Sequence, residues 1–104
     1  MTTVVVVGDA EEQLRAIDDW WRANRGAAAT LVVDEFDRCV TLLEHSPDIG
    51  VGFHRTDVPG VRRLVMKRTK HFVYYVHDAG NEVVYIVAVW GAPKGGDPVL
   101  RDPR

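Results

Sequence analysis

The sequence predicts a single α+β domain, residues 1–104, with an N-terminal helical hairpin packed on one face of an antiparallel β-sheet. Three observations predict this fold in the order β-α-α-β-β-β. The chain opens on a β-branched run, two stretches then repeat apolar residues at helical spacing, and three strand-like runs follow with turn residues between them. A length of 104 residues suits one domain with one modest core.

The first strand is expected at residues 2–7, where four valines precede Gly8. Asp9 is then the expected N-cap of the first helix, with Glu12 as its capping-box partner. Gly26 is the expected C-cap. The apolar stripe of this helix comprises Ala10, Leu14, Ile17 and Trp21. Trp20 lies beside the stripe, and the sequence leaves open a core position or an exposed interface anchor for it.

The second helix is expected from about residue 28 to residue 44, and Ser46-Pro47 ends it. Its apolar stripe comprises Val32, Phe36, Cys39, Val40 and Leu43. Cys39 is the chain's single cysteine, so it cannot form an internal disulfide and is expected to be a small core residue. The acidic pairs Asp18-Asp19 and Asp34-Glu35 are expected to be solvated on helix surfaces.

Three strands are expected at about residues 61–68, 71–77 and 82–90, after a connector that holds a possible short strand. The tail from about residue 91 is rich in Gly and Pro and is expected to be mostly irregular. A tight joint at Thr69-Lys70 would place Arg68 opposite His71. One sheet face would then carry Leu64, Met66, Val73, Tyr75, Val84, Ile86 and Ala88, and the other Arg63, Val65, Lys67, Phe72, Tyr74, Val76 and Tyr85.

The charge of the chain is divided unevenly along its length. Residues 1–50 hold four Arg and ten Asp or Glu, a net −6, whereas residues 51–104 hold nine Lys or Arg and five acids, a net +4. The cations concentrate in Val61–Val76, "VRRLVMKRTKHFVYYV", beside aromatic residues. Such a surface can bind nucleic acid or an acidic partner segment, and the alternative is a solvated sheet edge protected from aggregation by its charges.

Several function classes lack their sequence signatures. No phosphate-binding glycine loop and no nucleophile elbow is present, and the four histidines show no zinc-ligand spacing. We therefore expect no metal and no cofactor. No apolar run has the ~18–20 residues that span a bilayer, so we expect a cytoplasmic protein without a membrane partner.

Three stretches carry a resemblance to a known family: "AIDDWWRANR", "EFDRCVTLLEHSPDIG" and, above all, "RRLVMKRTKHFVYYVHD" followed by "VVYIVAVW". Together they resemble the RelE/ParE toxins of bacterial type II toxin–antitoxin systems, and the ParE-like branch most. The resemblance covers roughly residues 11–100. It implies the helical hairpin on a sheet described above and a cognate antitoxin whose disordered tail folds on binding.

The resemblance implies two possible targets. ParE-like members bind and poison DNA gyrase without chemistry of their own, and on this interpretation the contact residues are Arg63, Lys67, Arg68, Tyr74, Trp90 and Lys94. RelE-like members cleave mRNA on the ribosome, and the residues for that alternative are His71, Arg62 and Arg68, with His71 as the acid or base. The tail offers Lys94 and two arginines but lacks the tyrosine of many RelE-like members, which favours gyrase.

Overall fold

The computed structural model describes residues 1–91 and 96–104, and it confirms the predicted α+β fold class. A strand, a helical hairpin and a run of strands follow one another in the predicted order. The helices are α1 (Gly8–Asn24) and α2 (Leu31–His45), and short 3-10 turns lie at Gly26–Ala28 and Ala79–Asn81. The strands are β1 (Thr3–Val6), β2 (Val51–Gly52), β3 (Val61–Met66), β4 (His71–Asp78) and β5 (Val83–Gly91).

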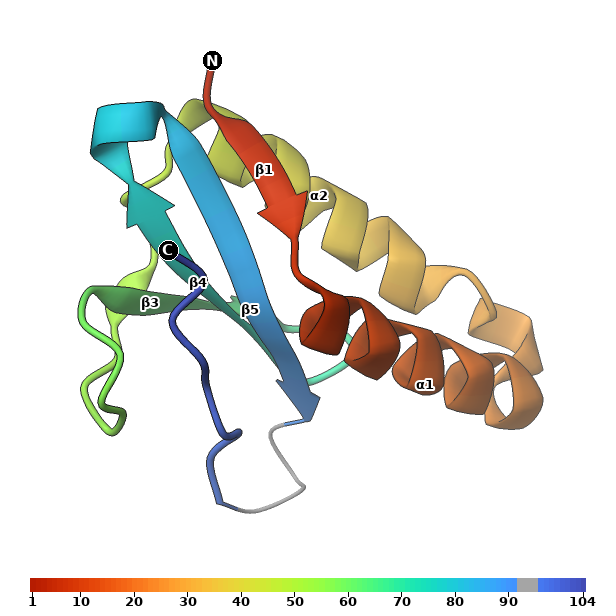
Figure 1. The fold of residues 1–104 in the computed structure, drawn as a ribbon. Coiled ribbons are helices and arrows are strands. Elements are labelled where there is room, and N and C mark those ends of the chain that lie inside the picture. Colours follow the sequence, from red (N-terminus) through yellow and green to blue (C-terminus); the bar gives the residue numbers. More distant parts are fainter. Residues whose placement is uncertain (92–95) are drawn as a thin grey trace.

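The five strands form one sheet in the order β1-β5-β4-β3-β2 (Figure 1). The last four strands pair antiparallel, as expected, and β2 is the short strand predicted in the connector. At the opposite edge, however, β1 runs parallel to β5, so the sheet is mixed. A tight hairpin forces its two strands to be antiparallel, whereas β1 and β5 are joined through the whole intervening chain and are free to align.

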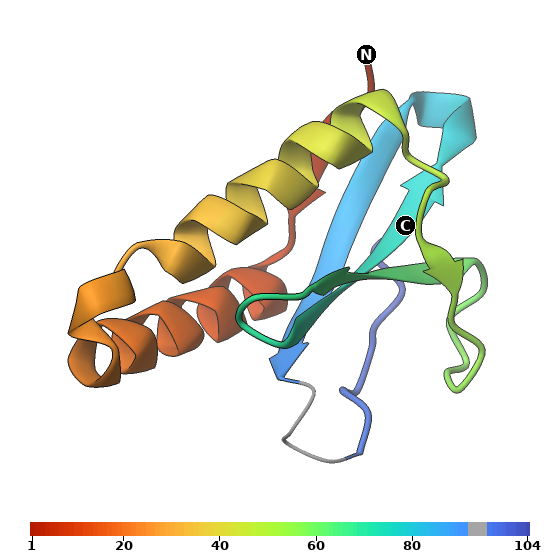
Figure 2. The same ribbon diagram turned by 180° about the vertical axis from the view of Figure 1, so that it is seen from behind.

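The helical hairpin covers one face of the sheet (Figure 2). The predicted stripes supply its core residues: Ala10, Leu14 and Ile17 from α1, and Phe36, Cys39, Val40 and Leu43 from α2. They pack on Leu64, Met66, Val73, Tyr75, Val84, Ile86 and Val89 from the sheet. Burial, with the charge of Glu35 second, raises the pKa of Cys39 to about 11, so the thiol is protonated at neutral pH. The tip of the hairpin extends beyond the strands in both ribbon views.

A second cluster of buried residues lies on the opposite face of the sheet. Phe53 and Val58 from the loop before β3 pack there on Val61, Tyr74, Val76, Val87 and Ala88, with Leu100 of the tail at its margin. Pro98 is also buried, and Arg104 donates to the carbonyl oxygen of Pro59 at 2.9 Å. The loop and the tail therefore cover much of the sheet face that lies opposite the helices.

The hairpin registers differ from those expected. His71 lies opposite Met66 rather than Arg68, because residues 67–70 form a four-residue turn in which Lys70 has a φ of 61°. The register also shifts between Tyr74 and Tyr75, which pair with Ala88 and Ile86. The extra residue on β5, Val87, is a β-bulge, and it moves Ala88 to the face opposite the one predicted. The other residues placed on the helix face lie there.

The helix boundaries depart from prediction by one to three residues, the largest difference being the start of α2 at Leu31 instead of about residue 28. Val7 is the N-cap of α1 and makes no side-chain cap, so Asp9 lies within the first turn. Arg25 is the C-cap, and Gly26 begins the 3-10 turn that leads to α2. The indole of Trp21 donates to the carbonyl oxygen of Ala28 at 2.8 Å, which ties this turn to α1. In the described ranges, neither helix is long and apolar enough to cross a membrane.

Candidate functional site

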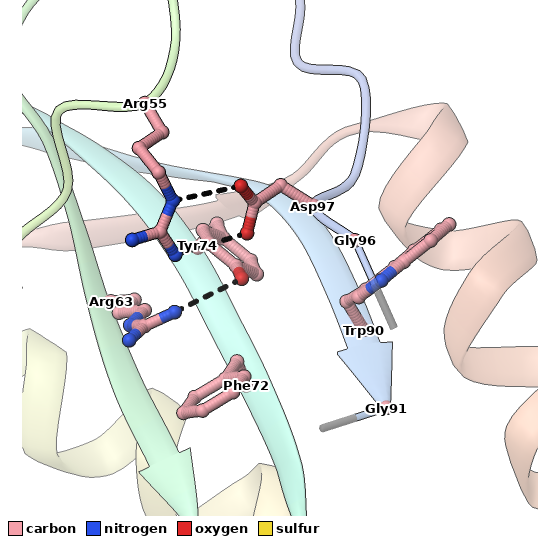
Figure 3. Close-up of a pocket in the computed structure, with 8 residues that line it drawn as sticks. All are labelled: Arg55, Arg63, Phe72, Tyr74, Trp90, Gly91, Gly96 and Asp97. Atoms are coloured by element: carbon pink, nitrogen blue, oxygen red, sulfur yellow. Dashed lines mark hydrogen bonds and ion pairs between the residues drawn. The ribbon is translucent and has the colours of Figure 1, made fainter. Parts of the chain in front are cut away.

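A pocket of about 420 Å³ opens on the sheet face opposite the helices (Figure 3). Its floor comes from β3, β4 and β5, and the loop before β3 and the C-terminal tail form its rim. The described lining residues combine two cations, one acid and three aromatic rings: Arg55, Arg63, Asp97, Phe72, Tyr74 and Trp90, with Gly91 and Gly96.

Arg63 is held at this pocket by aromatic rings. Its guanidinium carbon lies 4.1 Å from the centroid of the Phe72 ring and 5.5 Å from that of Phe53. It also donates to the hydroxyl of Tyr74 at 3.4 Å. Stacking of this kind fixes a guanidinium without neutralising it, because an aromatic ring carries no net charge. In the part of the chain that the structure describes, no ion pair joins Arg63 to a carboxylate.

Arg55 and Asp97 meet across the mouth of the pocket. The Nε of Arg55 donates to Oδ2 of Asp97 at 2.9 Å, and its Nη2 donates to Oδ1 at 3.2 Å. These hydrogen bonds from Arg55 are the main cause of a lowered pKa of Asp97. Burial is the second-largest effect and opposes the lowering, whereas the charges of Arg55 and Arg63 add to it. The guanidinium of Arg55 also lies 5.2 Å from the Phe53 ring, so two cations flank one ring and a single carboxylate faces both.

A larger hollow, the groove, has a volume of about 1080 Å³ and lies between α1 and the end of the β3–β4 hairpin. Three indoles line it, those of Trp20, Trp21 and Trp90, and its charged residues are Arg25, Arg68, Lys70 and His71. Trp20 is 53% exposed, so the structure places it at the surface rather than in the core. Trp90 lines both this groove and the pocket, and thus separates them.

Glu35 of α2 positions the turn that carries these cations. Its side chain is buried, and its carboxylate accepts hydrogen bonds from the backbone N–H of Arg68 at 3.0 Å and of Thr69 at 2.9 Å. The hydroxyl of Thr69 donates a third, at 2.7 Å. The expectation that Glu35 is solvated is therefore wrong, whereas its neighbour Asp34 is exposed as expected. The turn sets the direction of Arg68 and Lys70 because a buried acid fixes its backbone.

His71 lies half-buried at the end of this groove, and burial is the main cause of the lowering of its pKa from the ordinary 6.5. The backbone of Thr69 and the charge of Glu35 oppose that effect. Its Nδ1 is buried without a hydrogen-bond partner in the described chain. The imidazole is thus neutral at neutral pH and adds no charge to the cations beside it.

The lowered pKa of His71 predicts a loss of stability in mild acid. The unfolded chain takes up the proton first, so the His71 contribution is complete above pH 6.5 and falls as the pH drops toward the lower folded pKa. We expect His71→Gln to reduce the slope of unfolding free energy against pH in that window, measured by urea denaturation. His54→Gln is the matched control, because it makes the same substitution at an exposed histidine. An equal slope in wild type and His71→Gln would contradict the assignment.

The residues that the sequence predicted as a contact or catalytic site lie in different places in the structure. Arg63, Tyr74 and Trp90 meet at the pocket, and Arg68 and His71 meet at the groove, together with Trp90. Tyr74 is only 1% exposed, so it can act on a partner mainly through Arg63. Lys67 is exposed in the β3–β4 turn and lines neither hollow. Lys94 lies outside the described residues.

Arg62 lies apart from the other two residues of the RNase alternative. It pairs with Tyr75 in the sheet, donates to the carbonyl oxygen of Gly50 at 2.9 Å and lies 4.0 Å from Asp48. His71 pairs with Met66, four residues farther along β3. Arg62 is thus engaged with the connector before β3 rather than with the groove.

Sequence reasoning missed Phe53, Arg55 and Asp97. Phe53 and Arg55 come from a connector with no periodic pattern, and Asp97 comes from a tail rich in Gly and Pro. Arg55 and Asp97 are separated by 42 residues. The alternation of an aromatic residue and a cation in "FHR" was the one local signal, and it is too short to be specific.

Among the comparisons with known proteins, one family model matches the chain. The sequence model described as "ParE toxin of type II toxin-antitoxin system, parDE" matches residues 4–92. No curated protein is significantly similar in sequence. Among solved structures, the chromosomal ParDE toxin–antitoxin system from P. aeruginosa contains a chain with 23% identity and a TM-score of 0.70, over 88% of this chain and 96% of that one.

Two further structures share the fold. The intact E. coli RelBE toxin–antitoxin complex contains a chain with 15% identity and a TM-score of 0.63, over 88% of this chain and 98% of that one. The isolated E. coli RelE toxin has 15% identity and a TM-score of 0.59, over 91% of this chain and 88% of that one. At these identities the likeness concerns the fold alone.

Proposed function

The chain belongs to the ParE toxin family of type II toxin–antitoxin systems, and from this premise we propose that it halts bacterial growth by binding and poisoning DNA gyrase. A cognate antitoxin neutralises it. The toxin acts by contact rather than by chemistry of its own, and it stabilises the state in which gyrase has cleaved its DNA. The observation that carries the proposal is the match to the ParE family over residues 4–92.

The distribution of cations supports a contact surface at the β3–β4 end of the sheet. Arg63 at the pocket, Lys67 in the turn and Arg68 at the groove follow one another along the chain from β3 into the β3–β4 turn. Lys67 and Arg68 are exposed, and Trp90 lines both hollows. Exposed cations next to half-buried aromatic rings are the features that binding hot spots share. Lys94 is included in the proposed surface from the sequence alone.

Reversal of two of these charges tests the surface. We expect the double variant Arg63→Glu, Lys67→Glu to lose toxicity when it is expressed in bacteria, because both positions would then repel an acidic target. Arg15→Glu, Arg38→Glu is the matched control: it changes the net charge equally at two exposed helix positions. Thermal unfolding must show that both proteins fold. Full toxicity of the Arg63, Lys67 variant would remove this surface from the mechanism.

The target itself is tested with purified protein, gyrase and supercoiled plasmid. Linear DNA that appears after detergent and protease treatment, and only when the protein is present, is the expected result. No linear DNA from a protein that is toxic in cells would instead favour cleavage of mRNA on the ribosome. That alternative finds less support in the geometry, because Arg62 contacts Gly50 and Asp48 while His71 and Arg68 line the groove.

A further inference from the structure

The pocket on the sheet face opposite the helices holds more positive charge than the described part of the chain compensates. Two guanidiniums, those of Arg55 and Arg63, line it, and the single acid among its described lining residues is Asp97. Asp97 accepts two hydrogen bonds, both from Arg55, and in the described part of the chain it accepts none from Arg63. A single carboxylate neutralises one of the two guanidiniums. About one positive charge therefore remains at a site where aromatic rings hold both cations.

We propose that this pocket is a binding site for an acidic side chain of a partner protein, and that Asp97 occupies it when the partner is absent. The tail of the chain thus supplies an intramolecular stand-in for the ligand. The inference rests on the proposed function only in placing a protein partner at this pocket, and it assigns the chemistry of the group that the partner inserts.

The geometry of Asp97 indicates a carboxylate as the ligand. Both of its oxygens accept from one guanidinium, at 2.9 and 3.2 Å, which is the fork-to-fork arrangement that carboxylates form with arginine. The rings of Phe72 and Trp90 flank the same space and can pack against the apolar stem of a glutamate (Figure 3). The hydroxyl of Tyr74, already an acceptor for Arg63, holds that second guanidinium toward the pocket.

The charge of the whole chain argues against nucleic acid as the ligand. Net charge at neutral pH is −2 and the sequence pI is about 6.0, so the long-range field of the protein repels a polyanion. A short acidic segment contacts only the nearby cations, so the net negative charge of the whole chain repels it less than it repels a polyanion.

The bond between Arg55 and Asp97 is suited to displacement. The side chain of Arg55 is 68% exposed and that of Asp97 is 30% exposed, and ion pairs in contact with solvent stabilise a protein only slightly. The tail is anchored elsewhere, by buried Pro98 and by the hydrogen bond from Arg104 to Pro59. Asp97 can therefore swing away from Arg55 while the tail stays on the sheet.

This arrangement predicts that removal of the Asp97 charge tightens the binding of an acidic peptide. An internal competitor weakens the apparent affinity by the fraction of molecules it blocks. The probe is the blocked peptide acetyl-Ala-Phe-Glu-Ala-amide at low ionic strength, followed by NMR of the arginine Nε–H signals. We expect Asp97→Asn to bind it about three- to fivefold more tightly than wild type, as the loss of an exposed ion pair implies, and Arg63→Gln to bind it more weakly.

Matched variants separate this effect from a change in net charge. Asp102→Asn removes the same charge from the same tail, but Asp102 pairs with Arg104 rather than with the pocket, so its affinity should equal that of wild type. The peptide with Gln in place of Glu should not bind. Asp97→Ser serves as a second variant if Asp97→Asn proves unstable in thermal unfolding.

Three outcomes would overturn the proposal. They are equal affinity of wild type and Asp97→Asn, equal tightening in Asp102→Asn, and equal binding of the Gln peptide. Hexathymidylate offers phosphates instead of a carboxylate, and its tighter binding at the same arginine signals would identify a nucleic-acid site. Because gyrase takes no part in this assay, a negative plasmid-cleavage result leaves the peptide result intact, and the reverse holds as well.

Discussion

Replacement of Gly50 by alanine should destabilise the protein by about 3 kcal/mol, because overpacking of a buried site and the loss of a buried hydrogen bond act together. A Cβ at this position would lie 2.6 Å from the hydroxyl oxygen of Tyr75 and 3.0 Å from the backbone oxygen of Arg63. Neither neighbour can yield easily. Tyr75 is fully buried between the sheet and the helices, and the Arg63 oxygen belongs to β3.

The clash would also break the contacts that hold the connector before β3. The N–H of Gly50 donates to the Tyr75 hydroxyl at 2.8 Å, and its carbonyl accepts from Arg62 at 2.9 Å. A shift of Gly50 away from Tyr75 loses both hydrogen bonds and moves β2, which begins at the next residue. We expect the melting temperature to fall by about 10 °C or more, as measured by circular dichroism.

Gly26→Ala is the control for Gly50→Ala, since a Cβ at Gly26 would meet nothing within 4 Å. Its unfolding free energy should stay close to that of wild type. Tyr75→Phe removes the hydroxyl and thus the closest contact, so the double variant should lose less stability than the two single changes together. Additive losses, or a harmless Gly50→Ala, would show that the connector adjusts without cost.

Replacement of Glu35 by alanine should also cost about 3 kcal/mol, because hydrogen bonds to a charged acceptor are each worth more than neutral ones and three are lost together. The backbone N–H groups of Arg68 and Thr69 and the Thr69 hydroxyl would all lose their acceptor. The β3–β4 turn would then be free to move, and the cations on it would lose their fixed direction. Chemical denaturation measures the stability, and plasmid cleavage by gyrase measures the effect on the surface.

Two control variants test whether the effect of Glu35→Ala comes from the lost hydrogen bonds to the turn. Asp37→Ala removes a charge from an exposed position of the same helix and should be nearly neutral. Glu35→Gln keeps the shape but presents one amide NH₂ toward the N–H donors, so its loss should lie between those of wild type and Glu35→Ala. If Asp37→Ala and Glu35→Ala were equally destabilised, general helix electrostatics rather than the turn would account for the effect.

The helices and strands were predictable because their signals are local. The stripe of Phe36, Cys39 and Leu43 is spaced as a buried helix face requires, and the valine-rich run of β1 favours a strand wherever it pairs. The hairpin registers were harder to predict from the sequence. Lys70 takes a φ of 61° without being Gly or Asn, and the bulge at Val87 has no sequence mark, so neither irregularity could be anticipated.

The sequence by itself determined the elements, their order, the helix-facing core and the family to which the chain belongs, because periodicity and motif are properties of neighbouring residues. Only the tertiary structure decided that Glu35 is buried under a turn and that Asp97 faces Arg55 and Arg63. The sequence does not show whether the carboxylate of an aspartate or glutamate is surrounded by water or contacts a guanidinium. Its surroundings depend on chain segments that are distant in sequence and that folding alone brings together.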